Sequence, residues 1–177
     1  MNAPAMPSPL VLAGFMGCGK TTVGRLLGQR LGWHFCDLDD RIEATAGCGI
    51  AAIFAQRGEP AYRELEHREL RHALGEAGRR PTVLALGGGT FVQPQNLEPL
   101  RQAGGCTVFL EVPLEELLLR VAGMANRPLF RDEASFRALY AQRVPYYRQA
   151  QVTVAASLAP AQVAERVMEA VTRVMAG

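Results

Sequence analysis

The stretch Gly14-Phe15-Met16-Gly17-Cys18-Gly19-Lys20-Thr21-Thr22 decides the fold, because it fits the pattern GxxxxGK[ST]. It follows the apolar run 10–13 and opens a segment, 21–31, with apolar residues at helical spacing. In such a strand–loop–helix unit, glycines let backbone N–H groups face phosphate oxygens at the positive end of the helix. The pattern therefore predicts that Lys20 reaches the β and γ phosphates of a nucleotide and that Thr21 ligates magnesium. The alternative is a glycine-rich turn that binds no ligand.

The whole chain has the composition of one globular domain. Its 177 residues are 49% hydrophobic and carry a net charge of +2, and Lys20 is the only lysine among 19 lysine and arginine residues. Charges so nearly balanced give no reason to expect nucleic acid or an acidic membrane surface as a partner. No apolar run approaches the roughly 20 residues that span a bilayer. We expect a single domain over 10–177, and a monomer, since no apolar stripe demands a partner.

The N-terminal residues and the cysteines indicate the cellular compartment that we expect for the protein. The first nine residues contain three prolines and no basic residue, so we expect 1–9 to be a disordered tail and not a signal peptide. The cysteines form no CxxC pair and have no histidine at ligand spacing, which disfavours structural zinc and a disulfide framework. Reduced thiols in a cytoplasmic protein fit this usage better. The cysteines are Cys18, Cys36, Cys48 and Cys106.

Strand-like apolar runs alternate with helical patterns along the chain, which predicts an α/β fold with a parallel sheet. The expected strands are 10–13, 34–36, 82–86, 107–111 and 151–154. The expected helices are 21–31, 50–56, 62–74, 94–103, 114–121, 134–147 and 160–175.

A cluster of carboxylates follows the second expected strand, in the sequence Asp37-Leu38-Asp39-Asp40. Carboxylates just past a parallel strand lie at the carboxyl edge of the sheet, where ligands bind in α/β folds. One of them could hold magnesium through water while another accepts a proton from a substrate hydroxyl. The alternative is that Asp39 or Asp40 only caps a helix that begins at Arg41.

The third expected strand ends in Gly87-Gly88-Gly89, at a place where many ATPases carry an acidic residue. Three glycines allow a substrate or phosphate to approach the main chain closely and to accept hydrogen bonds from its N–H groups. The missing acid disfavours motor-type ATPases. A plain turn is the other reading.

Four arginines form the last set of candidates: Arg63, Arg120, Arg127 and Arg143. A guanidinium group can bind a carboxylate or a phosphate through two parallel hydrogen bonds, so such a set suits an anionic substrate and a transferred phosphoryl group. Taken singly, an arginine is more often a solvated surface charge than a functional residue.

The ordered set of motifs resembles the shikimate kinase family over nearly all of residues 8–175. The resemblance is carried by the phosphate loop and by five further segments. These segments are FCDLDDRIE (35–43), GEPAYRELE (58–66), LGGG (86–89), NRPLF (126–130) and QRVPYYRQA (142–150). The resemblance implies a three-layer α/β fold with a five-stranded parallel sheet, as in nucleoside monophosphate kinases, and a mobile lid at about 123–133.

The resemblance also implies roles for individual residues. Asp37 would support magnesium through water beside Thr21, and Asp39 would help to deprotonate the attacking hydroxyl. Lys20 and Arg127, the latter carried by the lid, would stabilise the transferring phosphoryl group. The implied ATP-binding residues are Gly17, Cys18, Gly19, Lys20, Thr21, Thr22, Arg120 and Arg127. Among them, Arg120 would stack near the adenine.

For the acceptor, the resemblance implies shikimate, phosphorylated by ATP at its 3-hydroxyl on the route to aromatic amino acids. Arg63 and Arg143 would bind its carboxylate, and Glu66 would orient Arg63. The implied substrate-binding residues are Asp39, Arg63, Gly87, Gly88, Gly89 and Arg143. Two alternatives stay open: a gluconate or nucleoside monophosphate kinase, and a nucleotide-binding regulatory protein without turnover.

Overall fold

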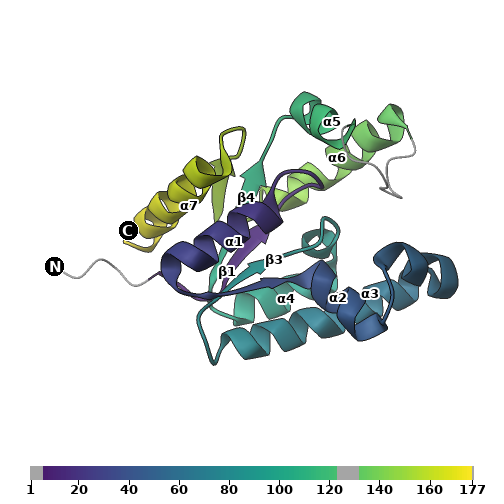
Figure 1. The fold of residues 1–177 in the computed structure, drawn as a ribbon, viewed down its shortest axis with the longest axis horizontal. Helices are drawn as coiled ribbons and strands as arrows, with labels where there is room; N and C mark the ends of the chain where they lie inside the picture. Colours follow the sequence, from purple (N-terminus) through teal and green to yellow (C-terminus); the bar gives the residue numbers. More distant parts are fainter. Residues whose placement is uncertain (1–5, 123–131, 177) are drawn as a thin grey trace.

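The computed structural model describes residues 6–122 and 132–176, which fold around a parallel β-sheet (Figure 1). The described residues contribute five strands to it, in the order β2-β3-β1-β4-β5. This confirms the predicted α/β class and the parallel sheet. The strands are β1 (Leu10–Ala13), β2 (His34–Asp37), β3 (Thr82–Ala85), β4 (Cys106–Glu111) and β5 (Val152–Ala155).

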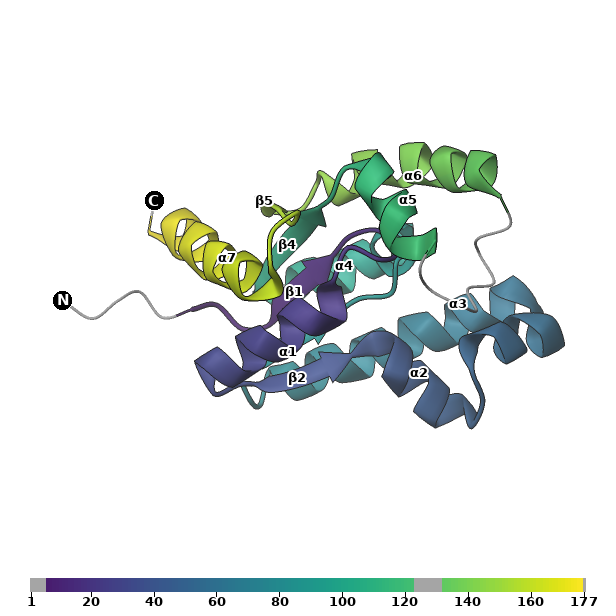
Figure 2. The same ribbon diagram turned by 45° about the horizontal axis from the view of Figure 1, so that its top comes forward.

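Helices cover both faces of the sheet and complete the three layers. Helices α1 and α7 lie together on one face, whereas α3 and α4 lie on the other (Figure 2). The helices are α1 (Lys20–Leu31), α2 (Leu38–Ala46), α3 (Ile50–Ala77), α4 (Pro94–Gln102), α5 (Leu114–Ala122), α6 (Glu133–Tyr147) and α7 (Pro160–Met175), with a 3₁₀ turn η1 (Thr90–Val92). No helix of the described segments is long and apolar enough to cross a membrane.

The core lies between the sheet and these helices. All four residues of β1 and all four of β3 are buried, as expected for central strands covered on both faces. Helix α1 packs closely on the sheet through Gly24, where a Cβ atom would lie 2.4 Å from the ring of Phe35. This close packing fixes the N-terminus of α1 above the carboxyl ends of β1 and β3, which is where the site forms.

The predicted helices 50–56 and 62–74 both lie within α3. Two helices meet there at a kink at Gly58 (φ 78°, ψ 170°), a backbone conformation that is essentially restricted to glycine. Pro60 follows the break, in the first turn of the second half, where a missing N–H is tolerated.

The expected tail extends too far into the chain. Ser8 is half-buried, and its hydroxyl accepts a hydrogen bond from the backbone N–H of Thr82 at 3.1 Å. The carbonyl of Pro9 accepts one from Cys106 N–H at 2.9 Å. Ser8 and Pro9 are therefore bound to the starts of two strands, while residues 1–5 lie outside the described part of the chain.

Candidate active site

A cavity of about 1130 Å³ opens at the carboxyl end of the sheet. It is bounded by the phosphate loop, by the start of α2, by both halves of α3, by the glycine turn after β3 and by α6. Parallel sheets bind ligands at this edge, so the cavity is the candidate active site. The candidate residues that line it are Gly17, Gly19, Lys20, Thr21, Thr22, Asp37, Asp39, Arg63, Gly88, Gly89 and Arg143.

The phosphate loop has the curled backbone that its glycines predicted. Gly14, Gly17 and Gly19 have φ values of 147°, 80° and 99°, which residues with a side chain rarely adopt. The Lys20 ammonium donates to the carbonyl oxygens of Gly14, at 2.8 Å, and Phe15, at 3.1 Å. The loop is thus preformed, and its lysine is held over the position that phosphate oxygens would take.

Cys18 lies within the loop with its side chain buried. Its Sγ is 3.8 Å from the Lys20 ammonium nitrogen. Because the thiol is enclosed, a nucleotide could meet Cys18 only through the backbone, so the predicted contact does not depend on the cysteine side chain.

Thr21 and Asp37 are brought together, although they are far apart in the sequence. The Thr21 hydroxyl donates to Asp37 Oδ2 at 2.6 Å, and Asp37 Oδ1 accepts a hydrogen bond from Asp39 N–H at 3.0 Å. Asp37 is therefore the N-cap of α2, which begins at Leu38. The alternative that Asp39 or Asp40 caps a helix starting at Arg41 was wrong, since the strand runs into the helix without a loop.

This pair of oxygen ligands fits a magnesium ion. Magnesium is usually held by one or two protein oxygens together with waters and substrate phosphates. A hydroxyl and a carboxylate at the rim of a phosphate loop supply such oxygens on the protein side. No group of three or more histidine, cysteine or acidic side chains suited to a metal occurs among the described residues, so the site has no all-protein metal cage.

Asp39 has the environment of a proton acceptor. Its Oδ1 is buried and has no hydrogen-bond partner within the described part of the protein. Burial, reinforced by the charge of Asp37 and opposed by that of Lys20, raises the pKa of Asp39 to about 6. The neighbouring Asp40 is instead exposed and lies 3.7 Å from Arg25. Asp39 is thus the carboxylate that is left for a ligand.

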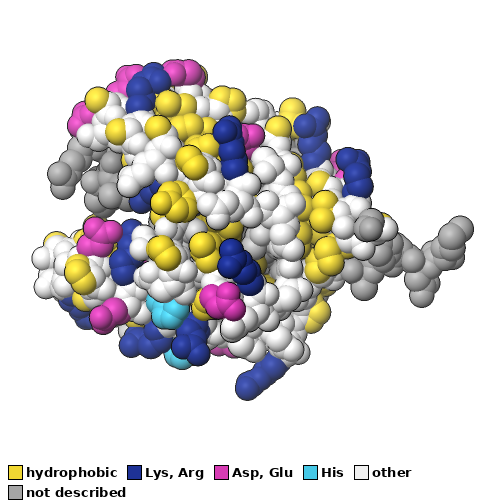
Figure 3. Space-filling view, turned by 180° about the vertical axis from the view of Figure 1, so that it is seen from behind, with side chains coloured by type: hydrophobic (Ala, Val, Ile, Leu, Met, Phe, Trp, Pro, Cys, Tyr) yellow, Lys and Arg dark blue, Asp and Glu magenta, His cyan; other side chains and the backbone are white. Residues whose placement is uncertain are grey.

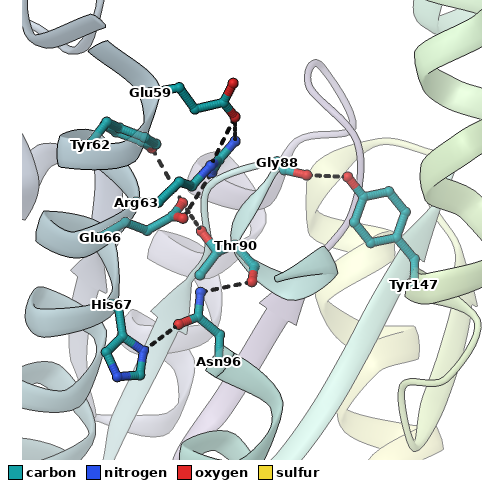
Figure 4. Close-up of polar contacts among 9 residues, drawn as sticks. All are labelled: Glu59, Tyr62, Arg63, Glu66, His67, Gly88, Thr90, Asn96 and Tyr147. Carbon is teal, nitrogen blue, oxygen red and sulfur yellow. Dashed lines mark hydrogen bonds and ion pairs between the residues drawn. The ribbon is translucent and has the colours of Figure 1, made fainter. Parts of the chain in front are cut away.

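Arg63 is held on the opposite wall by two carboxylates (Figure 4). Its Nη1 donates to Glu66 Oε2 at 2.8 Å, and its Nε and Nη2 each lie 3.2 Å from Glu59 Oε1. Glu66 is fully buried, and its Oε1 also accepts hydrogen bonds from the hydroxyls of Thr90 and Tyr62, at 2.7 and 3.3 Å. Glu66 therefore orients Arg63, as the resemblance implied.

The three glycines after β3 each leave room for a different group. A Cβ atom on Gly87 would lie 2.6 Å from Asp39 Oδ1, and one on Gly89 would lie 2.8 Å from Arg63 Nη1. At Gly88 it would lie 3.5 Å from Arg143 Nη1. None of the three has a positive φ, so glycine is needed here for space and not for backbone conformation. The turn thus brings Asp39, Arg63 and Arg143 around one point.

Arg143 completes this arrangement from helix α6. It is only 9% exposed, and its guanidinium lies 5.9 Å from the centre of the Phe15 ring. An arginine so buried is not the solvated surface charge that was the alternative. Its Nη1 faces Gly88 across the turn from Arg63.

Arg120 and Arg127 stand apart from this group. Arg120 does not line the cavity; it donates to the carbonyls of Gly17, at 3.2 Å, and Ala156, at 3.1 Å, and so ties the phosphate loop to the segment after β5. Its role beside adenine stays a prediction. Arg127 and most of the predicted lid (123–133) lie outside the described residues, whereas Asp132 caps α6 through Ser135 N–H at 2.7 Å.

Comparison with known proteins agrees with this geometry. The family model described as "Shikimate kinase" matches residues 16–172. The chain belongs to the shikimate kinase family. A shikimate kinase of Synechococcus elongatus is 40% identical over 171 residues, covering 94% of this chain and 87% of the relative. One of Geobacter sulfurreducens is 44% identical over 141 residues, covering 80% and 76%.

Solved structures of the shikimate kinase family share the fold. The shikimate kinase from Acinetobacter baumannii in complex with shikimate has a TM-score of 0.85 at 36% identity and covers 93% of this chain and 92% of that one. A gluconokinase from Sinorhizobium meliloti, at 17% identity and a TM-score of 0.64, shares the fold alone. The predicted family and architecture are confirmed, and the gluconate-kinase alternative has no support beyond the fold.

Two residues that support the cavity wall from behind were not predicted from the sequence. Thr90 and Tyr147 are both fully buried, and their hydroxyls hydrogen-bond to Glu66 and to the Gly88 carbonyl. Thr90 directly follows the three glycines, and Tyr147 lies within the QRVPYYRQA motif, so position beside a motif was the signal that could have found them.

Proposed function

We propose that this member of the shikimate kinase family transfers the γ-phosphate of ATP to the 3-hydroxyl of shikimate. The observation that carries the proposal is the unpaired, buried Asp39 Oδ1, which faces the same cavity as the phosphate-loop lysine and two arginines. A hydroxylated carboxylic acid supplies a partner for each group: its carboxylate for the arginines and a hydroxyl for Asp39. The Acinetobacter baumannii relative, solved in complex with shikimate, supports this choice of acceptor.

Each part of the reaction has its residues. Gly17 to Thr22 bind the ATP phosphates, and Lys20 leaves the carbonyls of Gly14 and Phe15 to pair with the β and γ phosphates. Thr21 and Asp37 would hold magnesium, the latter through water, and the ion would supply positive charge beside the phosphate oxygens. Arg120 remains assigned to the adenine side.

Asp39 accepts the hydroxyl proton as the oxygen attacks. With a pKa raised to about 6, its carboxylate is ionised near neutral pH yet basic enough to take up a proton in the transition state. Arg63, Arg143 and the N–H of Gly88 bind the carboxylate and fix the hydroxyl close to Asp39. Arg127, from the lid, is assigned to the transferring phosphoryl group.

We further propose that the protein acts as a monomer in the cytoplasm, without nucleic acid or membrane partners. The four cysteines, all in the described part of the chain, are free, which suits a reducing compartment. Acidic and basic side chains both lie on the face shown in Figure 3, so no one-signed patch for nucleic acid is present there. The exposed large apolar residues are dispersed over α5, α6, α7 and the segment after β5.

The test is magnesium-dependent ADP release with shikimate, gluconate, AMP and CMP offered separately at equal concentration. We expect rapid turnover with shikimate alone, lost in a Lys20→Ala control. If gluconate or a nucleotide were the preferred acceptor, the assignment of Arg63 and Arg143 would be wrong while the kinase assignment held. Tight ATP binding without turnover of any acceptor would instead favour the regulatory alternative.

A further inference from the structure

The glycine turn lies between the two arginines that face the cavity. On one side Gly88 is next to Arg143, and on the other Gly89 is next to Arg63. The two arginines come from different helices, α6 and α3, so neither helix alone sets the distance between them. The contacts that hold each guanidinium group against the turn therefore also set the distance between Arg63 and Arg143.

On the Arg63 side, the link is the hydroxyl of Thr90 (Figure 4). It donates its single proton to Glu66 Oε1 at 2.7 Å, while Glu66 Oε2 accepts from Arg63 Nη1 at 2.8 Å. The Thr90 backbone belongs to the turn, because its N–H donates to the Gly87 carbonyl at 3.1 Å and its carbonyl accepts from Asn96 Nδ2 at 3.0 Å. Thr90 and Glu66 are both fully buried, so these bonds have no competition from water.

On the Arg143 side, the link is the hydroxyl of Tyr147. It donates a hydrogen bond to the carbonyl of Gly88 (Figure 4), and Gly88 is the residue that Arg143 Nη1 faces. The Tyr147 ring is fully buried and stacks on Phe109 of β4, with ring centres 5.3 Å apart. Because the ring is fixed against the sheet, its hydroxyl holds the Gly88 peptide in place, and with it the part of the turn that faces Arg143.

We propose that Thr90 and Tyr147 are positioning residues. Their two buried hydroxyls hold the glycine turn and the two arginines in the relative positions that bind the acceptor's carboxylate. The inference rests on the proposed function, which assigns Arg63 and Arg143 to that carboxylate. Neither Thr90 nor Tyr147 is among the described residues that line the cavity, so both act through their neighbours.

This role differs measurably from a general contribution to stability. A buried hydrogen bond that only stabilises the fold lowers the melting temperature and leaves the Michaelis constants unchanged. A bond that sets the arginines weakens binding of the acceptor and leaves ATP, which binds at the phosphate loop, unaffected.

The experiment compares Thr90→Val and Tyr147→Phe, which remove each hydroxyl with little change of shape, with Thr90→Ser, which restores it. Each removal is expected to raise KM for shikimate about tenfold, as for the loss of one buried hydrogen bond, while KM for ATP stays within about twofold. The serine variant should resemble the unmodified protein. Kinetics are measured with each substrate varied in turn, and melting temperatures are recorded for every variant.

Two matched controls remove similar hydroxyls away from the turn. Thr82 is buried and donates to the carbonyl of Arg80 at 2.9 Å, and Tyr140, also on α6, donates to the carbonyl of Val112 at 3.2 Å. Thr82→Val and Tyr140→Phe should leave KM for shikimate unchanged, whatever they do to the melting temperature.

A second readout uses the methyl ester of shikimate, which lacks the negative charge that the arginines bind. For this acceptor, the increase in KM caused by Thr90→Val and Tyr147→Phe should shrink from about tenfold to less than about twofold. An equal increase for acid and ester, or a change in melting temperature alone, would overturn the inference while leaving the proposed function intact. Failure of the unmodified protein to phosphorylate shikimate would instead remove the proposed function, and this inference with it.

Discussion

Replacing Asp39 by asparagine should inactivate the protein and stabilise it at neutral pH. The pKa of this carboxyl is 3.8 in an unfolded chain and rises to about 6 in the fold, mainly through burial. One pKa unit is worth about 1.4 kcal/mol, so ionised Asp39 destabilises the folded state by up to about 3 kcal/mol. Asparagine has a similar shape without the charge.

The sign of the pH dependence follows from the direction of the shift. Below about pH 4 the carboxyl is protonated in both states, and the folded protein has no penalty. Between about pH 4 and pH 6 the folded state binds the proton more tightly than the unfolded chain does, so stability falls as the pH rises. Above about pH 6 the penalty is complete.

The assay is thermal unfolding without nucleotide or metal, in buffer containing a chelator. At about pH 7, Asp39→Asn should melt about 6 to 12 °C above the unmodified protein, and the difference should close as the pH falls towards about 4. The same variant should lose a factor of about 10² to 10⁴ in kcat. Asp40→Asn is the matched control, because Asp40 is exposed; little change in either property is expected.

Two results would refute this reasoning. If Asp39→Asn were no more stable than the unmodified protein at neutral pH, the carboxylate would be solvated and not buried. A stability difference that persisted unchanged at low pH would show that packing, and not ionisation, was its cause.

Four further substitutions test other parts of the structure. Gly89→Ala would place a Cβ atom 2.8 Å from Arg63 Nη1, so steady-state kinetics should show KM for shikimate raised about tenfold with KM for ATP unchanged. Arg63→Lys replaces a planar donor by a point charge and should raise the same constant by a similar factor of about ten, whereas an unaltered value would place the carboxylate elsewhere. Gly24→Ala should destabilise the fold by about 1 to 3 kcal/mol in urea unfolding, because Phe35 occupies the space of the added methyl group. Gly75→Ala, with nothing within 4 Å, should instead stabilise it by about 0.5 to 1 kcal/mol.

The sequence allowed much of the framework to be predicted. Strand β1 and helix α7 have the predicted bounds, because a short apolar run beside glycines and a strongly amphipathic segment are local signals. The phosphate loop could be predicted for the same reason, since its glycines and Lys20 are adjacent in the chain. In these segments the local sequence favours the same backbone conformation that the tertiary structure requires.

What could not be predicted depends on contacts between distant segments. The family resemblance placed Asp37 beside Thr21, but no local pattern required it, and the pairing of Tyr147 with Gly88 was not predicted. Both pairs are neighbours only once the sheet has formed. In the residue pattern alone, Asp37, Asp39 and Asp40 looked alike as a run of acids, and only the family resemblance gave them separate roles. In the structure, Asp39 has a buried oxygen, Asp37 caps helix α2 and Asp40 is exposed. These differences depend on the tertiary structure and not on the local sequence.

The contacts of Arg63 have a consequence for selectivity among anions. Three of its nitrogens are already occupied by Glu59 and Glu66, so the guanidinium in the open cavity is a neutralised group and not a free cation. Glu66 is buried and Glu59 is largely exposed, so a carboxylate that bound Arg63 as proposed would exchange with Glu59. A simple anion such as chloride or phosphate gains little from that exchange, because it replaces one charge pair by another. An acceptor that also reaches Arg143 and Asp39 would gain additional contacts. Arg63 would therefore select an anion by the groups attached to its carboxylate and not by its charge alone.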